Sequence, residues 1–277
     1  MIQRPFTVVL DDGELIRGEL RLPEGPPTSS AVVVVHGFKG FKDWGFFPHM
    51  CGSLASDGHA VVSFNFSRGG IGSDPMRFTE LEAFARNTVS REVDEVLGIL
   101  RSVRDDDLLP RLPERIGLLG HSRGGGDAIV AARDDGHVDA LATWAAIATF
   151  DRWSDEVKET WRREGRIHVE NARTGQQMPL DVTLLEDFEA NRKRLDVEAA
   201  AAQLRIPWLI VHGEDDPAVS ALDARRLVRA NPDAMLEMIP GAGHTFEATH
   251  PFQGPTPELE RALEATRRHF RRHLLEG

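Results

Sequence analysis

The stretch that decides the fold is Gly120-His121-Ser122-Arg123-Gly124, which follows an apolar run ending at Leu119. Gly125-Gly126 and a helix-forming segment from Asp127 to Arg133 come after it. A strand, a Gly-x-Ser-x-Gly turn and a helix in this order are typical of a nucleophile elbow, in which a serine hydroxyl stands at the end of a parallel strand. The alternative is a glycine-rich loop that contains a serine by chance. We expect a side chain at Gly120 or Gly124 to collide with the neighbouring strand or helix, and we predict Ser122 as a nucleophile.

The rest of the chain alternates between apolar segments and helix-forming segments. The segments expected to form strands are 6–10, 15–22, 31–35, 60–65, 116–119, 140–147, 204–212 and 235–239, the first two as a hairpin with an Asp-Gly turn. The segments expected to form helices are 46–56, 87–104, 220–230 and 258–275. The run at 31–35 has no polar alternation, which is typical of a strand covered on both faces. This order predicts an α/β fold with a mostly parallel central sheet and helices on both faces.

The helix expected at 87–104 has a clear apolar face, which includes Val93 and Leu100. Charged residues are expected on the opposite, solvated face: Arg91, Glu92, Glu95 and Arg101. Four histidines on charged segments are also expected in solvent: His137, His168, His269 and His273. His121, beside the predicted nucleophile, is expected to point away from the reaction centre and to be structural.

Residues 150–203 interrupt the alternation of strands and helices. This segment holds Trp153 and Trp161, a possible hairpin of residues 166–171 and 176–180, and a charged helix expected at 186–195. An insertion of this length between two strands of the sheet is most simply a cap over the strand ends. We therefore predict one α/β core formed by residues 1–149 and 204–277, with a cap insertion at 150–203.

A serine hydroxyl needs a base, and the base needs a group that orients it. After an elbow the expected order is an acid followed by a histidine. The last two strands are followed by loops that contain three acidic residues and then His244. Asp216 is the predicted acid because the turn with Pro217 directs it towards the histidine loop. Asp215 is the second choice and Glu214 the third.

Acyl transfer also needs hydrogen-bond donors for the negative oxygen of its intermediate. The backbone N–H of Arg123, directly after the nucleophile, is one predicted donor. The loop after the strand at 31–35, His36-Gly37-Phe38, is expected to supply the other through the N–H of Phe38. The alternative for this loop is a plain turn from strand to helix.

The composition limits the classes of partner. The net charge of -11 argues against nucleic acid and anionic membrane surfaces as partners. The single Cys51 excludes an internal disulfide and a cysteine-based zinc site. The glycine-rich loop at 69–72 lacks the spacing of a nucleotide fingerprint, so no cofactor and no metal are expected. The sequence shows no leader peptide and no apolar membrane span, and we expect a cytoplasmic protein.

Four motifs together resemble the α/β-hydrolase superfamily: His36-Gly37-Phe38, Gly120-His121-Ser122-Arg123-Gly124, His212-Gly213 with Asp216 and Val219, and Gly243-His244. The resemblance covers nearly the whole chain. The pattern His-Gly-Phe-x-Gly and the loop Arg68–Ser73 are similar to the dienelactone-hydrolase-like and feruloyl (cinnamoyl) esterase-like branch. Dienelactone hydrolases proper use a cysteine nucleophile, where this chain has Ser122.

We therefore predict a serine esterase that cleaves small-molecule carboxylic esters through an acyl-enzyme on Ser122, His244 and Asp216. Thioesterase, amidase or peptidase, and acyltransferase activity on the same triad stay open. A non-catalytic binding protein with this fold is the weaker alternative, because such proteins usually lose a triad member. The sequence is compatible with a homo-oligomer and does not fix the oligomeric state.

Overall fold

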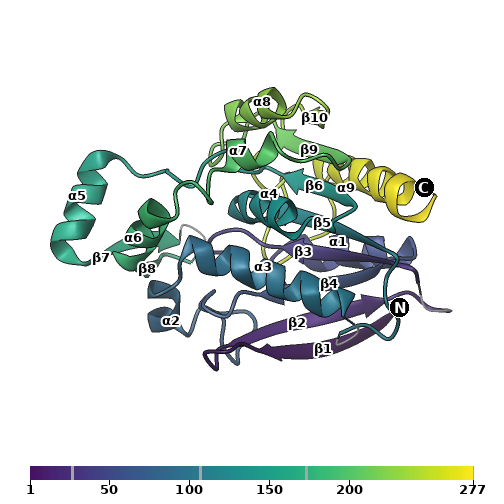
Figure 1. Ribbon diagram of the computed structural model, residues 1–277, viewed down its shortest axis with the longest axis horizontal. Coiled ribbons are helices and arrows are strands. Elements are labelled where there is room, and N and C mark those ends of the chain that lie inside the picture. The colour runs from purple at the N-terminus through teal and green to yellow at the C-terminus, as the bar shows by residue number, and fades with distance from the viewer. Residues whose placement is uncertain (26–27, 106–107, 172–173, 277) are drawn as a thin grey trace.

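One central sheet of eight strands organises the computed structural model, which describes residues 1–25, 28–105, 108–171 and 174–276 (Figure 1). The order of the strands is β1-β2-β4-β3-β5-β6-β9-β10. The pairs β1–β2 and β2–β4 are antiparallel, and the other pairs are parallel. The strands are β1 (Ile2–Val9), β2 (Leu15–Leu22), β3 (Ser30–Val35), β4 (Ala60–Asn65), β5 (Arg115–His121), β6 (Ala140–Trp144), β9 (Trp208–Gly213) and β10 (Met235–Ile239). The predicted hairpin and the mostly parallel sheet are confirmed.

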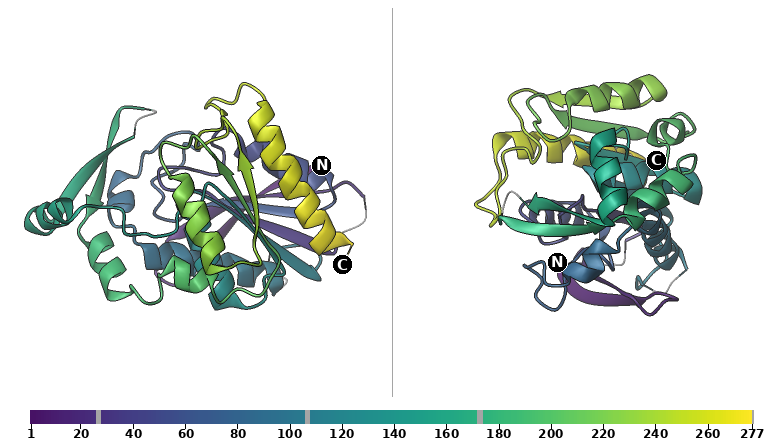
Figure 2. Two further views of the ribbon diagram at one scale, coloured as in Figure 1. Left: turned by 90° about the horizontal axis from the view of Figure 1, so that it is seen from above. Right: turned by 90° about the vertical axis from the view of Figure 1, so that its left-hand side faces the viewer.

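Helices cover both faces of this sheet, as predicted. One face carries α1 (Phe47–Ser56) and α9 (Pro257–Phe270), which continues into the π-helical turn η1 (Arg271–Leu275). The other face carries α3 (Val89–Arg104), α4 (Arg123–Asp135) and α8 (Ala221–Ala230). Figure 2 shows α8 and α9 on opposite sides of the sheet. No described helix is both long enough and apolar enough to cross a bilayer.

Strand β3 shows why its sequence lacks polar alternation. Val33 and Val35 pack into the core beneath α3 and α4, whereas Val32 and Val34 pack into the core beneath α1 and α9. Successive side chains of a strand point to opposite faces, so a strand between two helical layers needs apolar residues at every position. Burial on both faces at 31–35 is therefore confirmed.

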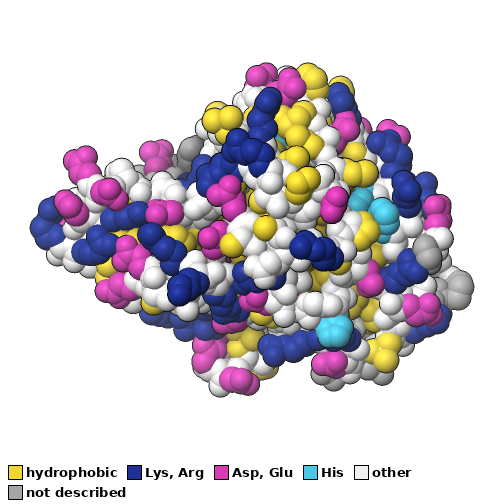
Figure 3. All heavy atoms as spheres, turned by 45° about the horizontal axis from the view of Figure 1, so that its top comes forward, with side chains coloured by type: hydrophobic (Ala, Val, Ile, Leu, Met, Phe, Trp, Pro, Cys, Tyr) yellow, Lys and Arg dark blue, Asp and Glu magenta, His cyan; other side chains and the backbone are white. Residues whose placement is uncertain are grey.

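Between β6 and β9 the chain leaves the sheet and forms α5 (Asp155–Glu164), the hairpin of β7 (Arg166–Asn171) and β8 (Gln176–Asp181), α6 (Thr183–Ala190) and α7 (Val197–Ala201). Trp161 of α5 is fully buried and donates from Nε1 to the carbonyl of Leu180, 2.9 Å away. Arg166 pairs with Glu82 on α2 (Leu81–Ala85). Helix α5 and the hairpin of β7 and β8 project from one end of the molecule, whereas α7 lies against α4 and α8 (Figure 1). Side chains of both charges cover the surface of the projecting part (Figure 3). Its role as a cap stays a prediction.

The helix predicted at 186–195 is wrong in its limits, since α6 begins at Thr183 and ends at Ala190. The next residue, Asn191, donates from its side-chain amide to the backbone carbonyl of Asp187. A side chain that takes a helical carbonyl in this way favours the end of a helix. The run of charged residues at 186–195 suggests one continuous helix, but it does not show where the helix ends.

Three polar residues expected in solvent are buried: Glu92, Glu95 and His269, with 4%, 3% and 4% of their surface exposed. The two glutamates can be buried because Arg123 and Arg91 pair with them, at 2.7 Å and 2.8 Å. Burial lowers the pKa of His269 to about 4, so this ring is neutral at pH 7. The assignment of all three to a solvated surface is therefore wrong.

Candidate active site

Ser122 lies in the turn that joins β5 to α4, where its backbone has a φ of 60° and a ψ of -123°. A positive φ is uncommon for a residue with a side chain, and such strain concentrates at functional sites. The turn is tight: a Cβ at Gly120 would lie 2.2 Å from the Gly124 carbonyl oxygen, and a Cβ at Gly124 would lie 2.3 Å from the His36 carbonyl oxygen. The steric reason predicted for these glycines is confirmed. Helix α4 begins at Arg123, earlier than the segment expected from Asp127.

Ser122, His244 and Asp216 lie in one hydrogen-bonded row. The Ser122 Oγ is 3.0 Å from Nε2 of His244, and Nδ1 of His244 is 2.7 Å from Oδ2 of Asp216. The three residues follow β5, β10 and β9, whose carboxyl ends meet at one edge of the sheet. Glu214 and Asp215, the other acidic candidates, are exposed to solvent. The structure thus brings together the three residues that the sequence singled out.

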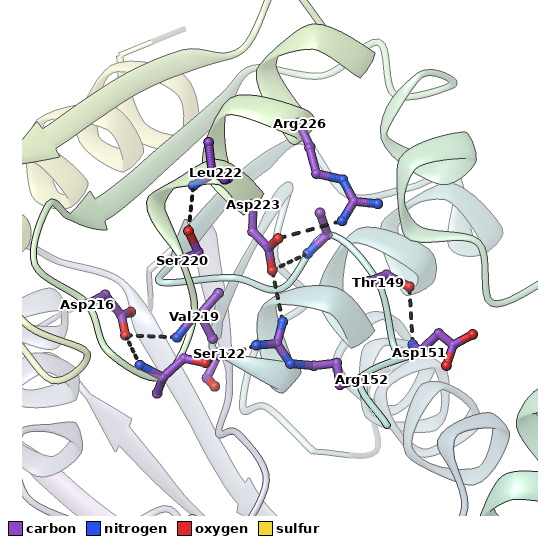
Figure 4. A network of polar contacts seen from close by, with 12 residues as sticks. Ser122, Thr149, Asp151, Arg152, Asp216, Val219, Ser220, Leu222, Asp223 and Arg226 are labelled. Atoms are coloured by element: carbon purple, nitrogen blue, oxygen red, sulfur yellow. Dashed lines mark hydrogen bonds and ion pairs between the residues drawn. The ribbon is translucent and has the colours of Figure 1, made fainter. Parts of the chain in front are cut away.

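The carboxylate of Asp216 is held from two sides. Its Oδ1 accepts the backbone N–H groups of Ala218 and Val219, at 2.8 Å and 2.9 Å (Figure 4), while Oδ2 faces His244. Burial alone would raise the pKa of Asp216, but His244 and the two N–H groups outweigh burial and hold this pKa below its usual value. An ionised carboxylate only accepts hydrogen bonds, so Nδ1 of His244 carries the proton and Nε2 is left to accept from Ser122.

Arg152 braces the loop that carries Asp216. It comes from the chain just after β6 and donates from Nη2 to the carbonyl of Ala218 and from Nη1 to the carboxylate of Asp223, both at 2.9 Å (Figure 4). Asp223 lies in the first turn of α8. The acid loop is therefore fixed between the start of α8 and the chain that leads out to the projecting part.

His121 supports the loop that carries His244. Its Nε2 donates to the backbone carbonyl of His244 at 3.0 Å, and the two rings lie 4.8 Å apart. His121 itself is buried, with ring contacts to Phe46 and Phe47. The structure agrees with the prediction that His121 is structural and adds that it contacts the backbone of the predicted base.

The two residues predicted to supply oxyanion donors are Arg123, directly after Ser122, and Phe38, in the loop after β3. Arg123 is the first residue of α4, and the first N–H groups of a helix have no partner within the helix. The loop after β3 lies against the nucleophile, since a Cβ at Gly37 would be 2.8 Å from the Ser122 Cβ and 3.3 Å from its Oγ. Phe38 follows directly in this loop.

A cavity of about 390 Å³ opens above the row. Ser122 and His244 line it together with apolar side chains (Phe38, Val89, Ile147, Phe150, Trp153, Ala218, Val219), three cationic ones (Lys39, Arg123, Arg152) and Asn171. The space is that of a small organic molecule. Within the described part of the chain, no cluster of His, Cys, Asp or Glu could hold a metal ion.

Comparison with known proteins decides the family. The model of the dienelactone hydrolase family matches residues 16–274. The chain belongs to the dienelactone hydrolase family. The 2,6-dihydropseudooxynicotine hydrolase of Paenarthrobacter nicotinovorans is 25% identical to this chain over 208 residues, which are 71% of this chain and 47% of that protein. The chain thus spans about half the length of this relative.

Solved structures agree with the α/β-hydrolase fold of this dienelactone hydrolase family member. Est1E from Butyrivibrio proteoclasticus, with ferulic acid bound, superposes with a TM-score of 0.72 at 20% identity and covers 97% of this chain and 98% of its own. The esterase domain of a Rhodothermus marinus protein gives a TM-score of 0.64 at 21% identity, covering 99% of this chain and 100% of its own. The chain therefore has the α/β-hydrolase fold, and the resemblance seen in its motifs is confirmed.

Sequence reasoning missed a buried charged cluster beside the elbow. The cluster consists of Glu92 on α3 with Arg123 and Asp127 on α4, and the first two form an ion pair. Asp127 is fully buried, and neither of its carboxyl oxygens has a hydrogen-bond partner among the described residues. Burial and the nearby charge of Glu92 raise the pKa of Asp127 well above its usual value, against the effect of Arg123. Burial also raises the pKa of Glu92, against the effect of Arg123 and Asn87, which stabilise its charged form. We assign the proton of the cluster to Asp127, because Asp127 has no such hydrogen-bond partner among the described residues.

Asp127→Asn is expected to gain stability over the wild type as the pH rises. The unfolded chain releases the Asp127 proton above a pH of about 4, whereas the folded protein keeps it. Within that window the free energy of unfolding of the wild type therefore falls with pH, by up to about 1.4 kcal/mol per pH unit. The amide of asparagine has the shape of the protonated acid and no proton to lose, so the difference between variant and wild type should grow from pH 5 to pH 8.

Urea unfolding at several pH values measures this difference. Asp155→Asn is the matched control, since the side chain of Asp155 is 99% exposed. Its difference from the wild type should stay constant with pH. A flat or falling difference for Asp127→Asn would contradict a neutral Asp127.

Proposed function

We propose that this member of the dienelactone hydrolase family is a serine esterase that works through an acyl-enzyme. The observation that carries the proposal is the continuous row from the strained Ser122 through His244 to the charged Asp216, which opens on a cavity. A hydroxyl becomes a usable nucleophile when a neighbouring base accepts its proton. Here Nε2 of His244 takes the proton of Ser122 as Oγ attacks the acyl carbon. Asp216 keeps the imidazole in the required tautomer and stabilises its positive form.

His244 then gives this proton to the departing alcohol, which leaves the acyl group on Ser122. In the second half of the reaction, His244 takes a proton from the water that attacks the acyl group and returns it to Oγ of Ser122 as the acid leaves. The backbone N–H groups of Arg123 and Phe38 hold the negative oxygen of both tetrahedral intermediates. The position of Arg123 at the start of α4 and the closeness of the Gly37 backbone to Ser122 support this role.

The cavity supports a small ester as the substrate. Its apolar side chains suit an acyl chain or a ring, and its volume of about 390 Å³ limits the substrate to a small molecule. One neighbour in structure, Est1E, is seen with ferulic acid, and this argues for including aromatic esters among the candidates. Thioesters and amides pass through the same intermediate, so the row of residues by itself does not choose between them.

A panel of acetyl, butyryl and feruloyl esters, with the matching thioesters and anilides, tests the proposal. We expect the esters to give the highest kcat/KM and mass spectrometry of quenched reactions to find the acyl group on the peptide that contains Ser122. Turnover without any acylated Ser122 would reject the acyl-enzyme. A preference for thioesters or anilides would keep the mechanism and replace the substrate class.

A further inference from the structure

The buried ion pair of Glu92 and Arg123 lies directly beside the proposed oxyanion site. The Arg123 Nε is 2.7 Å from Oε2 of Glu92, and only 9% and 5% of the two side chains are exposed. On its other oxygen, Oε1, Glu92 accepts the side-chain amide of Asn87 at 2.7 Å. Glu92 is therefore fixed from two directions, and it fixes the guanidinium of Arg123 in turn.

The guanidinium of Arg123 lies over an aromatic ring. Its central carbon is 5.0 Å from the centre of the Phe38 ring, a distance that gives a favourable cation–π contact. The same ring stacks with Phe84, with 5.6 Å between the ring centres and an angle of 27° between the planes, and Lys39 Nζ lies 5.6 Å from its centre. Phe38 thus contacts Arg123, Phe84 and Lys39.

This stack joins the two residues whose backbone N–H groups are the proposed oxyanion donors. The backbone of Arg123 is fixed by its place at the start of α4. Phe38 lies in a loop after β3, followed by Lys39 with a φ of 55°, and no helix or strand holds it. The contact between the Arg123 side chain and the Phe38 ring therefore holds Phe38 in a fixed position relative to α4.

We propose that Glu92 is a positioning residue of the oxyanion site, holding the Arg123 guanidinium against the Phe38 ring so that the two backbone N–H groups keep their spacing. The inference rests on the proposed function, because it assumes that both N–H groups bind the negative oxygen. Backbone donors act only when they are placed where the charge develops, and an error of about 1 Å in position can cost about 100-fold in rate.

Stability alone is a weak explanation for this pair. A buried ion pair often contributes nothing, or less than nothing, compared with apolar residues of similar size, since both charges lose their water. The same helix offers a comparison in Glu95, which is equally buried and pairs with Arg91 at 2.8 Å. Glu95 accepts from the backbone and side chain of Ser67, and its ion pair is with Arg91, not with Arg123 of the elbow.

The test compares Glu92→Gln with Glu95→Gln in the full chain. For Glu92→Gln with p-nitrophenyl butyrate we expect kcat to fall by about 10- to 100-fold, while KM stays within about 3-fold. Affinity for butylboronic acid, which forms a tetrahedral adduct with a serine hydroxyl, should fall in parallel with kcat. Glu95→Gln should leave both quantities within about 2-fold of the wild type, even where urea unfolding shows that both variants lose stability.

Phe38→Leu tests the same contact from the other side and serves if Glu92→Gln fails to fold. It should show the same joint loss of kcat and of boronic acid affinity, and combining it with Glu92→Gln should add little, because both changes break one contact. Each of three results would overturn the inference. The two glutamate variants could have equal kcat, kcat could fall without a loss of boronic acid affinity, or the effects of Glu92→Gln and Phe38→Leu could be additive. A wild-type protein that forms neither an acyl group nor a boronic adduct on Ser122 would instead reject the proposed function.

Discussion

Ser122→Ala is expected to lower kcat for p-nitrophenyl butyrate by at least about 10,000-fold. Alanine leaves His244 and the oxyanion donors in place but removes the only atom that can form the acyl bond. The activity that remains should come from bound water, oriented by the same site, and should lack a burst of p-nitrophenol. Steady-state and rapid-mixing assays with the same ester measure both quantities.

The folding of this variant should not suffer. Ser122 has a positive φ, and alanine at the same backbone angles carries no new strain. We expect the free energy of unfolding to stay within about 1 kcal/mol of the wild type. Ser53→Ala is the matched control, since this serine lies on α1, away from the site, and its hydroxyl donates to the carbonyl of His49. Retained turnover in Ser122→Ala, with an unchanged fold, would show that the elbow is not the reaction centre.

The position of this serine could be predicted because it depends on local geometry. The glycines at 120 and 124 are required by carbonyl oxygens that lie within 2.3 Å of where a Cβ would be, and such a requirement is written into a short stretch of sequence. Strand β3 is predictable for a similar reason, because burial on two faces leaves an unbroken apolar run. The order of the strands then brings the ends of β5, β9 and β10 to one edge.

The buried cluster could not be predicted in the same way. Glu92 and Arg123 are far apart in sequence, and an apolar pattern with a period of 3.6 assigns any glutamate to the polar face. The pair forms because α3 packs against α4, which places the guanidinium of Arg123 next to the buried carboxylate of Glu92. Asp127 is harder still, since it is buried with no hydrogen-bond partner among the described residues. Pairing across helices leaves no local signal in either segment.

The choice of Asp216 among the three acidic residues is partly predictable from the sequence. The turn with Pro217 favours Asp216 in the sequence. In the structure this turn directs the N–H groups of Ala218 and Val219 to one carboxyl oxygen and leaves the other oxygen for His244. The loop thus holds the carboxylate through backbone N–H groups, which do not depend on particular side chains. The sequence pattern therefore does not identify the acid as firmly as a substitution of each candidate does.

Asp216→Asn is expected to lower kcat by about 10,000-fold, with little change in KM. The reason lies in the two backbone N–H groups at Oδ1. An asparagine side chain must keep its carbonyl oxygen on these donors, so its NH₂ group faces Nδ1 of His244. Two donors cannot face each other, and Nδ1 must then give up its proton to become an acceptor. The proton moves to Nε2, and the ring can no longer accept a proton from Ser122.

Asp215→Asn is the matched control for this change. Asp215 is the neighbouring residue, it is exposed, and its backbone N–H already donates to the carbonyl of Ala242 at 3.0 Å. Its side chain has no part in fixing the tautomer of His244, so kcat should stay within about 2-fold of the wild type. The ring nitrogen shifts of His244, measured by NMR, should report Nε2–H in Asp216→Asn and Nδ1–H in Asp215→Asn. If the two variants ranked in the opposite order, Asp215 would be the acid, and the hydrogen bond from His244 to Asp216 would be a contact without a catalytic role.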